Sequence, residues 1–353
     1  MARPVPTAQI ISVIAGVTKS TVSRALQGDE RISLETRQRI LKIAEKVGYT
    51  PNAVARSLTT KQSGIIGYAI GQTENVFFQE QLERISLIAH ERNARLMLFS
   101  IPDGQNVTDV LPVMLQYRLD GCIVIASVPI TAGAVEKCMR YRMPLVLLNR
   151  IGPKTGASSV LCDNVGGARD IVRFLLASDH SRIAYIGGRP GSAISQDRER
   201  GMREAFDTAG EKLYDERVGH FTFEGGRQAA RELMSTKARP DAIFAANDLM
   251  AFGAIDAVKE IGLRIPEDVS VVGFDGARAG AWPAYNLTTM VQPVESMFTT
   301  AIEFVERQRI EPLRPPETVY IAPQFLQRGS SRLPKARTPG FVGSPEPIRK
   351  KGR

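Results

Sequence analysis

Short apolar runs alternate with stretches of helical periodicity through most of this 353-residue chain. The runs are continuously apolar, which is typical of strands in a parallel sheet that helices cover on both faces. The alternation starts near Ile65 and begins again after Asp163, so we predict two doubly wound α/β lobes with a ligand cleft between them. The expected strands are Ile65–Ile70, Arg95–Ser100, Asp120–Ala126, Pro144–Leu148, Arg182–Gly187, Ala242–Ala246 and Val269–Phe274, and the expected helices include Phe78–Asn93, Gly166–Ala177, Arg198–Ala209 and Asp248–Ile261.

A different pattern occupies the N-terminus, where Ala15-Gly16-Val17 separates two short helical patterns. Gly16 can adopt the left-handed conformation that a sharp turn between helices requires. Thr18 can cap the following helix by accepting hydrogen bonds from its first turn. In that helix Val22 and Leu26 share one face and can be buried. The other positions are hydrogen-bonding or cationic: Lys19, Ser20, Thr21, Ser23 and Arg24.

Side chains of this kind read base edges when a helix enters the major groove of DNA. The alternative is a solvated amphipathic helix, which charge alone favours. Thr7 can cap a preceding helix, and Ile10, Ile11 and Ile14 share one face of it. A third helical pattern spans residues 33–48. Three short helices with this turn predict a helix-turn-helix head.

Positive charge is concentrated at the two ends of the chain, whose net charge is +9. Residues 1–62 carry ten Lys or Arg against four Asp or Glu, and residues 331–353 carry seven against one. The segment between them therefore has a net charge of −3. A basic head on a mildly acidic body favours a polyanionic partner for the head.

Composition also marks the boundaries between the parts of the chain. The run Thr59–Gly64 is polar and linker-like, and a short helical segment over Ala53–Leu58 precedes it. A helix of that length is only marginally stable alone in water. We therefore predict a helix-turn-helix head over 1–49, a hinge helix and linker over 50–63, a two-lobed body over 64–330, and a basic disordered tail over 331–353. Within the body we assign residues 64–162 and 293–321 to lobe 1, and residues 163–292 and 322–330 to lobe 2.

Other features limit the class of protein. Hydrophobic residues make up 43% of the chain, as in ordinary folded proteins. The N-terminus has no apolar signal region and no run approaches the length of a membrane span, so we expect a cytoplasmic protein without a membrane partner. We expect Cys122, Cys138 and Cys162 to be buried free thiols. Since no metal-ligand spacing and no adjacent nucleophile–base pair occurs, we expect no metal, no cofactor and no enzymatic activity.

A set of motifs runs from the head to the end of the body. They are Ala15-Gly16-Val17-Thr18, Thr21-Val22-Ser23-Arg24-Ala25-Leu26, Gly48-Tyr49-x-Pro51-Asn52, Ala55-Arg56-Ser57-Leu58, Asp120-Gly121, Ile183-Ala184-Tyr185-Ile186-Gly187-Gly188, Ala246-Asn247-Asp248, Ile265-Pro266-x-Asp268-Val269-Ser270-Val271-Val272-Gly273-Phe274-Asp275 and Leu287-Thr288-Thr289. Together they resemble the lactose-repressor (LacI/GalR) family of bacterial transcription regulators. The resemblance implies a hinge helix after the head and a periplasmic-binding-protein-like body. It also implies a repressor that binds a pseudo-palindromic operator in double-stranded DNA as a homodimer under the control of a small effector.

The resemblance assigns roles on DNA to residues of the head and hinge. Lys19, Ser20 and Arg24 correspond to positions at which the family reads base edges. Thr18, Thr21, Ser23 and Asn52 suit phosphate contacts, which position a protein without specifying sequence. Leu58 corresponds to a leucine that the family inserts into the minor groove, and Ala55 permits close approach. The alternative for Leu58 is an exposed linker leucine.

The resemblance also places an effector site in the cleft. Aromatic faces stack on sugars while Asp, Asn and Arg bind adjacent hydroxyls, so the expected effector is a sugar or a sugar derivative. Trp282 is either a stacking residue or a lid or core anchor, and Arg198 is either a ligand contact or an exposed helical arginine. Asn149 and Arg150 end a strand near the expected crossover, where they would contact the ligand or the hinge. The candidate effector contacts are Phe77, Phe78, Arg150, Arg198, Phe221, Asn247, Asp275, Trp282 and Gln292.

Two other classes of protein share parts of this pattern. A solute-binding protein of a transporter has the same two-lobed body, but the basic head and the lack of a signal region oppose it. A nucleotide-dependent enzyme would need a phosphate-binding loop, and Gly64-x-x-Gly67-x-x-x-Gly71 lacks the G-x-G-x-x-G order. An effector-controlled DNA-binding regulator therefore fits the sequence best.

Overall fold

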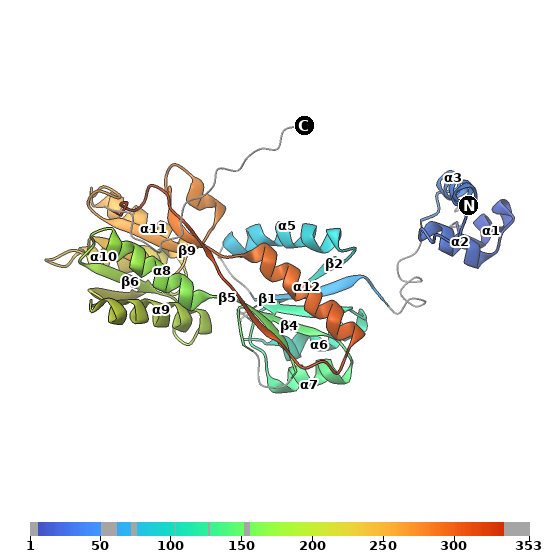
Figure 1. Ribbon diagram of the computed structural model, residues 1–353, viewed down its shortest axis with the longest axis horizontal. Coiled ribbons are helices and arrows are strands. Elements are labelled where there is room, and N and C mark those ends of the chain that lie inside the picture. The colour runs from blue at the N-terminus through green and yellow to red at the C-terminus, as the bar shows by residue number, and fades with distance from the viewer. Residues whose placement is uncertain are drawn as a thin grey trace. The chain divides into compact units, whose positions relative to one another are not determined.

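The computed structural model describes residues 6–50, 62–71, 76–102, 104–125, 128–151 and 156–334. The chain divides into two compact units, Met1–Gly64 and Ile65–Arg353. Figure 1 shows the first as a small helical head and the second as a larger α/β body. Each unit has its own hydrophobic core.

The head consists of three helices, α1 (Ala8–Ala15), α2 (Lys19–Leu26) and α3 (Leu34–Val47). Gly16 ends α1 in the left-handed conformation, with φ of 61°, as predicted for the turn. The side chain of Thr18 accepts a hydrogen bond from the backbone N–H of Thr21 at 3.1 Å and so caps α2. Ser33 caps α3 in the same way. The core of this bundle is formed by Ile11, Ala15, Val22, Ala25, Ile40 and Ala44.

Two expectations for the first helix are wrong. Thr7 stands at the N-terminal cap of α1, but its side chain makes no capping hydrogen bond. Ile11 is fully buried, whereas Ile10 and Ile14 are 38% and 55% exposed. The face that packs on the other helices contains Ile11 and Ala15, one turn apart, and not the face of Ile10 and Ile14.

Lobe 1 of the body is built on a six-stranded sheet in the order β11-β5-β4-β3-β1-β2, in which all pairs are parallel. In Figure 1, α5 and α12 lie together on one side of this sheet and α6 and α7 on the other. The strands are β1 (Ile65–Gly71), β2 (Arg95–Ile101), β3 (Gly121–Ile125), β4 (Leu145–Leu148), β5 (Ser158–Cys162) and β11 (Thr318–Ile321). The helices are α5 (Val76–Glu91), α6 (Val107–Gln116), α7 (Ala132–Arg140) and α12 (Val294–Ile310).

Lobe 2 has a second six-stranded sheet in the order β12-β10-β9-β8-β6-β7, parallel except for β12 against β10. Helix α8 packs on α9, and α10 packs on α11. The strands are β6 (Ile183–Gly187), β7 (Asp215–Val218), β8 (Ala242–Ala245), β9 (Ser270–Asp275), β10 (Thr288–Val291) and β12 (Gln324–Leu326). The helices are α8 (Asn164–Ala177), α9 (Ala193–Ala209), α10 (Phe223–Met234), α11 (Asp248–Glu260) and the short 3-10 helix η1 (Arg278–Ala281).

The chain passes between the two sheets after β5, after β10 and after β11. The predicted fold class, a three-helix head followed by two doubly wound parallel sheets, is therefore confirmed. The predicted hinge helix lies outside the described residues. No helix among the described residues is long and apolar enough to cross a membrane.

Two smaller expectations have different outcomes. The three cysteines are free and buried, as predicted, and burial raises the pKa of the Cys138 and Cys162 thiols to about 12. The tail does not begin at residue 331, because Ser331 is 4% exposed and its hydroxyl lies 2.8 Å from that of Thr288. The backbone N–H of Arg332 donates to the hydroxyl of Ser270 in β9, so the chain still packs on lobe 2 at residue 332.

Close helix packing in lobe 2 depends on glycine. Gly253 lies in α11 where the backbone of α10 crosses it, and a Cβ atom there would lie 2.1 Å from the carbonyl oxygen of Phe223. The clash is with backbone, so it cannot be relieved by rotating a side chain.

We expect Gly253→Ala to destabilise the body by about 1–3 kcal/mol or more, because the two helices must separate. The measurement is urea unfolding followed by circular dichroism. Gly133→Ala in α7 is the matched control, since its nearest neighbour would be 3.9 Å away. An equal loss of stability in both variants would contradict this account of the packing.

Candidate functional site

The exposed surface of α2 carries the residues predicted to meet DNA. Lys19, Ser20 and Arg24 are exposed, while Val22 and Ala25 face the core. Within the described part of the head, neither Lys19 nor Arg24 forms an ion pair. Their charges are therefore available to a ligand.

The residues predicted to contact phosphates differ in their surroundings. Thr18 and Ser23 are exposed and Thr21 is half-buried. The hydroxyl of Thr18 lies 2.7 Å from that of Ser20 and 2.9 Å from that of Thr21, so it serves as a cap and remains at the surface. The hinge candidates Asn52, Ala55 and Leu58 lie outside the described residues.

A narrow pocket of about 40 Å³ lies between the two lobes of the body. Helix α5 of lobe 1 forms one wall, and Ile194 of α9 contributes from lobe 2. Amide groups of Gln81, Asn149 and Gln292 interrupt an otherwise mostly apolar lining. Among the described residues that line the pocket, none carries a charge. The apolar contribution comes from Tyr68, Phe77, Phe78, Ile85, Ile125, Leu148, Ile194, Val294, Met297 and Phe298.

Beside the pocket, a buried arginine is paired with an aspartate. Nη2 of Arg198 lies 3.1 Å from Oδ1 of Asp275, and the two residues are 2% and 4% exposed. The Arg198 guanidinium also donates to Oδ1 of Asn164 at 2.9 Å and to the carbonyl oxygen of Ala246, and it lies 3.7 Å above the ring of Phe274. Such a pair is tolerated in a core only when both partners are satisfied. The alternative of an exposed helical arginine is wrong.

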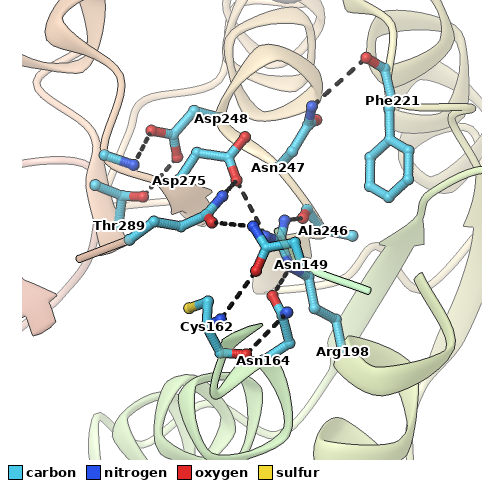
Figure 2. Close-up of polar contacts among 12 residues, drawn as sticks. Asn149, Cys162, Asn164, Arg198, Phe221, Ala246, Asn247, Asp248, Asp275 and Thr289 are labelled. Carbon is cyan, nitrogen blue, oxygen red and sulfur yellow. Dashed lines mark hydrogen bonds and ion pairs between the residues drawn. The ribbon is translucent and has the colours of Figure 1, made fainter. Parts of the chain in front are cut away.

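Six residues, two of which are Arg198 and Asp275, form a closed ring of hydrogen bonds that we call the interlobe ring (Figure 2). Gln292 donates to Oδ1 of Asp275 at 2.8 Å and accepts from the side-chain amide of Asn149 at 2.9 Å. Asn149 in turn accepts from the backbone N–H of Cys162 at 2.9 Å. Asn164 closes the ring by donating to the carbonyl oxygen of Cys162 at 3.2 Å.

The interlobe ring connects two of the three places at which the chain changes lobes. Asn149 directly follows β4 and Cys162 ends β5, both in lobe 1, and Asn164 begins the first helix of lobe 2. Gln292 follows β10, just before the chain returns to lobe 1. Because Asn149 and Gln292 also line the pocket, a ligand hydroxyl in the pocket can reach the ring directly.

Asp248 lies outside the ring and binds the backbone that follows Asp275. Its carboxylate accepts from the backbone N–H groups of Gly276 and Ala277 at 2.8 and 2.7 Å, and from the hydroxyl of Thr289 at 2.5 Å. Burial raises the pKa of Asp248 well above its usual value, the neighbouring Asp275 carboxylate adds to this increase, and these hydrogen bonds oppose it. The contacts fix the chain next to Asp275, whose φ of 137° lies in a region that few side chains adopt.

Comparison with known proteins agrees with this geometry. The model of "Bacterial regulatory proteins, lacI family" matches residues 11–52, and that of "Periplasmic binding protein-like domain" matches residues 172–331. The ribose operon repressor of Escherichia coli is 30% identical over 326 residues, which cover 91% of this chain and 98% of that protein. The chain belongs to the lacI family of bacterial regulatory proteins. The resemblance that the motifs indicated is confirmed.

Further lacI-family proteins match nearly the whole chain. The HTH-type transcriptional regulator DegA of Bacillus subtilis is 28% identical and covers 91% of this chain and 96% of its own length. A solved complex of the transcriptional regulator CelR with cellobiose has a TM-score of 0.67 and 26% identity, covering 92% of this chain and all of that one. The lac repressor dimer bound to operator and the anti-inducer ONPF has the same fold, with a TM-score of 0.79, 24% identity and coverage of 93% and 99%.

The structure brings some of the predicted effector residues together and leaves others apart. Phe77, Phe78 and Gln292 line the pocket, and Arg198 and Asp275 bind Gln292 or its ring neighbours. The remaining four do not line it: Arg150, Phe221, Asn247 and Trp282.

Each of these four residues has its own environment. Asn247 caps α11 by accepting from the backbone N–H of Met250 at 3.0 Å, and its amide lies 3.5 Å from the carbonyl oxygen of Phe221. Arg150 donates to the carbonyl oxygen of Val128, and burial lowers its pKa. Trp282 is 59% exposed, so the alternative of a core anchor is wrong.

Three residues of this lacI-family site were not predicted from the sequence: Gln81, Asn164 and Ile194. Asn164 was hidden in a loop-to-helix transition, and Gln81 stands among ordinary helix residues. Ile194 precedes the predicted helical start at Arg198, because α9 begins five residues earlier, at Ala193. A polar residue directly after Asp163, where the α/β alternation restarts, was the one usable signal for Asn164.

We expect Arg198→Met to lower the free energy of unfolding by about 3–5 kcal/mol, because the Asp275 carboxylate is left buried without its cation. The matched control is Arg200→Met in the same helix. Arg200 is 60% exposed and pairs with Asp197, so its loss should cost less than about 1 kcal/mol. Chemical unfolding of the two variants checks the difference, and similar losses would contradict the importance of the buried pair.

Proposed function

We propose that this protein is a transcriptional repressor that binds a pseudo-palindromic operator as a homodimer in the bacterial cytoplasm. We further propose that a neutral carbohydrate in the interlobe pocket controls its affinity for DNA. The proposal about the effector rests on one observation. The pocket shares Asn149 and Gln292 with the interlobe ring and lies beside a buried ion pair that has no net charge.

The DNA part rests on the exposed surface of α2. We assign base reading to Lys19, Ser20 and Arg24, because their side chains are exposed on one helix whose other side is anchored in a core. Arg24 is suited to bidentate bonding with a guanine, and phosphate contacts fall to Thr18, Thr21, Ser23 and Asn52. Leu58 and Ala55 are the proposed minor-groove residues.

We expect Arg24→Ala to weaken binding to the selected operator about 10- to 100-fold and to relax base preference at one position in each half-site, because a base-specific contact is lost. The test selects binding sequences from randomised duplexes and then measures affinity by fluorescence anisotropy. Arg39→Ala, which removes an exposed arginine from α3, is the control for charge. It should lower affinity at most uniformly across sequences. Unchanged base preference in Arg24→Ala would remove Arg24 from base reading.

The effector part rests on the chemistry of the pocket lining. Phe78, against which the buried Phe77 packs edge-on, offers aromatic surface for the C–H face of a sugar ring. The amides of Gln81, Asn149 and Gln292 can bond hydroxyls. Arg198 is already neutralised by Asp275, and none of the described residues that line the pocket is a cation that could bind a sugar acid or a sugar phosphate. The solved complex of the similar regulator CelR with cellobiose is consistent with a carbohydrate. The remaining candidate contacts, Arg150, Phe221, Asn247 and Trp282, do not line the pocket and would reach a ligand only after the lobes rearrange around it.

An effector can alter DNA binding only through unequal affinity for two conformations of the body. The interlobe ring supplies a physical route, because a sugar hydroxyl that replaces Asn149 on Gln292 breaks one of the links between the lobes. The rearrangement of lobe 1 would then change the separation of the two heads in the dimer.

We expect calorimetry against a panel of neutral sugars, uronic acids and sugar phosphates to show binding only within the neutral group. Asp275→Ala should abolish the signal, and Gln292→Ala, which retains the Arg198–Asp275 pair, should weaken binding about tenfold through the loss of hydrogen bonds. Gln228→Ala on the surface of α10 is the control. Tight binding of an anionic sugar, or unchanged binding in both pocket variants, would contradict the proposal.

A further inference from the structure

A second set of contacts, outside the interlobe ring, also joins the two lobes. Glu80 and Glu83 lie on α5 of lobe 1, and Arg278 begins η1 of lobe 2. The backbone N–H of Arg278 donates to Oε2 of Glu80 at 2.9 Å. Nη1 of Arg278 lies 3.6 Å from Oε2 of Glu83. The carboxylates of one lobe therefore hold the main chain and the side chain of a single residue in the other.

The helix that supplies these carboxylates also forms a wall of the pocket. Phe77, Phe78, Gln81 and Ile85 of α5 line the pocket, and Glu80 and Glu83 are interspersed among them. Any movement of lobe 2 away from α5 must therefore break the contacts with Arg278.

Arg278 is rigidly connected to the other side of the site. The segment from Asp275 to Arg278 begins with the carboxylate that pairs with Arg198. Its next two backbone N–H groups, those of Gly276 and Ala277, are held by Asp248. Four consecutive residues thus run from the interlobe ring to α5, and each of them is bound at a side chain or an amide.

We propose that Glu80, Glu83 and Arg278 form a charged clasp that holds the lobes in the conformation in which both line the pocket. Glu80 and Glu83 are positioning residues that favour effector binding without contacting the effector. The clasp is partly exposed, with Glu83 and Arg278 side chains 70% and 67% accessible, so salt should weaken it. The hydrogen bond from an amide to the Glu80 carboxylate is charge-assisted and is the stronger of its two contacts.

The proposal rests on the proposed binding of a sugar in the pocket, and a charge exchange tests it. With the neutral sugar that binds the wild-type protein, Glu80→Ala should raise the Kd about three- to tenfold. Glu83→Arg and Arg278→Glu should each raise it, and the double variant should restore it towards the wild-type value. These effects should shrink at high salt. Glu91→Arg, another exposed position on α5, is the control.

A measurement without sugar separates failure of the clasp from failure of the proposed function. Spin labels on Lys137→Cys in lobe 1 and Lys212→Cys in lobe 2 report the distance between lobes, since the native cysteines are buried. Labelled protein is mixed with excess unlabelled protein, so that distances between subunits do not contribute. Glu80→Ala and Arg278→Glu should lengthen or broaden the distance distribution, and the charge exchange should reverse the effect of Arg278→Glu.

The two measurements lead to distinct conclusions. If the wild-type protein binds no sugar, the proposed function fails, and the label distances still judge the clasp. Unchanged distances between the labels in Glu80→Ala and Arg278→Glu would overturn the clasp, whatever the affinity for sugar. Weaker sugar binding with no recovery in the charge exchange would overturn it too, because Glu83 would then act by some route other than Arg278.

Discussion

The buried pair of Arg198 and Asp275 is the interaction around which the body is organised. Removing two charges from water costs several kcal/mol for each ion, so such a pair persists only where every remaining donor and acceptor finds a partner. Asn164, Gln292 and the carbonyl oxygen of Ala246 provide those partners here. Their positions fix the ends of the strands that meet beside the pocket. The polar surface offered to a ligand is thus a by-product of neutralising one buried cation.

Much of the architecture could be predicted because it follows from local patterns. Continuous apolar runs identified seven parallel strands between Ile65 and Phe274 but missed β5 and the polar β7. The capping of α2 by Thr18 follows from its position before a helical pattern. The outward-facing side chains of α2 follow from the burial of Val22. The first helix shows the limit of this reasoning. Three isoleucines within one and a half turns leave the buried face undecided, and only contacts with the other helices select Ile11.

The candidate site was less predictable because it is assembled from long-range contacts. Arg198 and Asp275 are 77 residues apart, and Asn149 and Gln292 are 143 residues apart, so no spacing along the chain indicates that they meet. Motif resemblance placed Arg198, Asp275 and Gln292 in the site, but it did not indicate that an arginine beside Glu199 is buried. Gln81 and Ile194 carry no chemical signal of their own. The contacts assigned to Trp282, Phe221, Asn247 and Arg150 remain predictions.

The repeated passage of the chain between the two sheets restricts how the lobes can move. A single connecting segment would permit rotation about many axes and some translation. Three segments, after β5, after β10 and after β11, resist sliding and wide separation of the lobes more strongly, because all three would have to extend at once. The remaining soft motion is a rotation about an axis that runs close to all three. A ligand that rotates lobe 1 about that axis from one side therefore also displaces the opposite side of lobe 1.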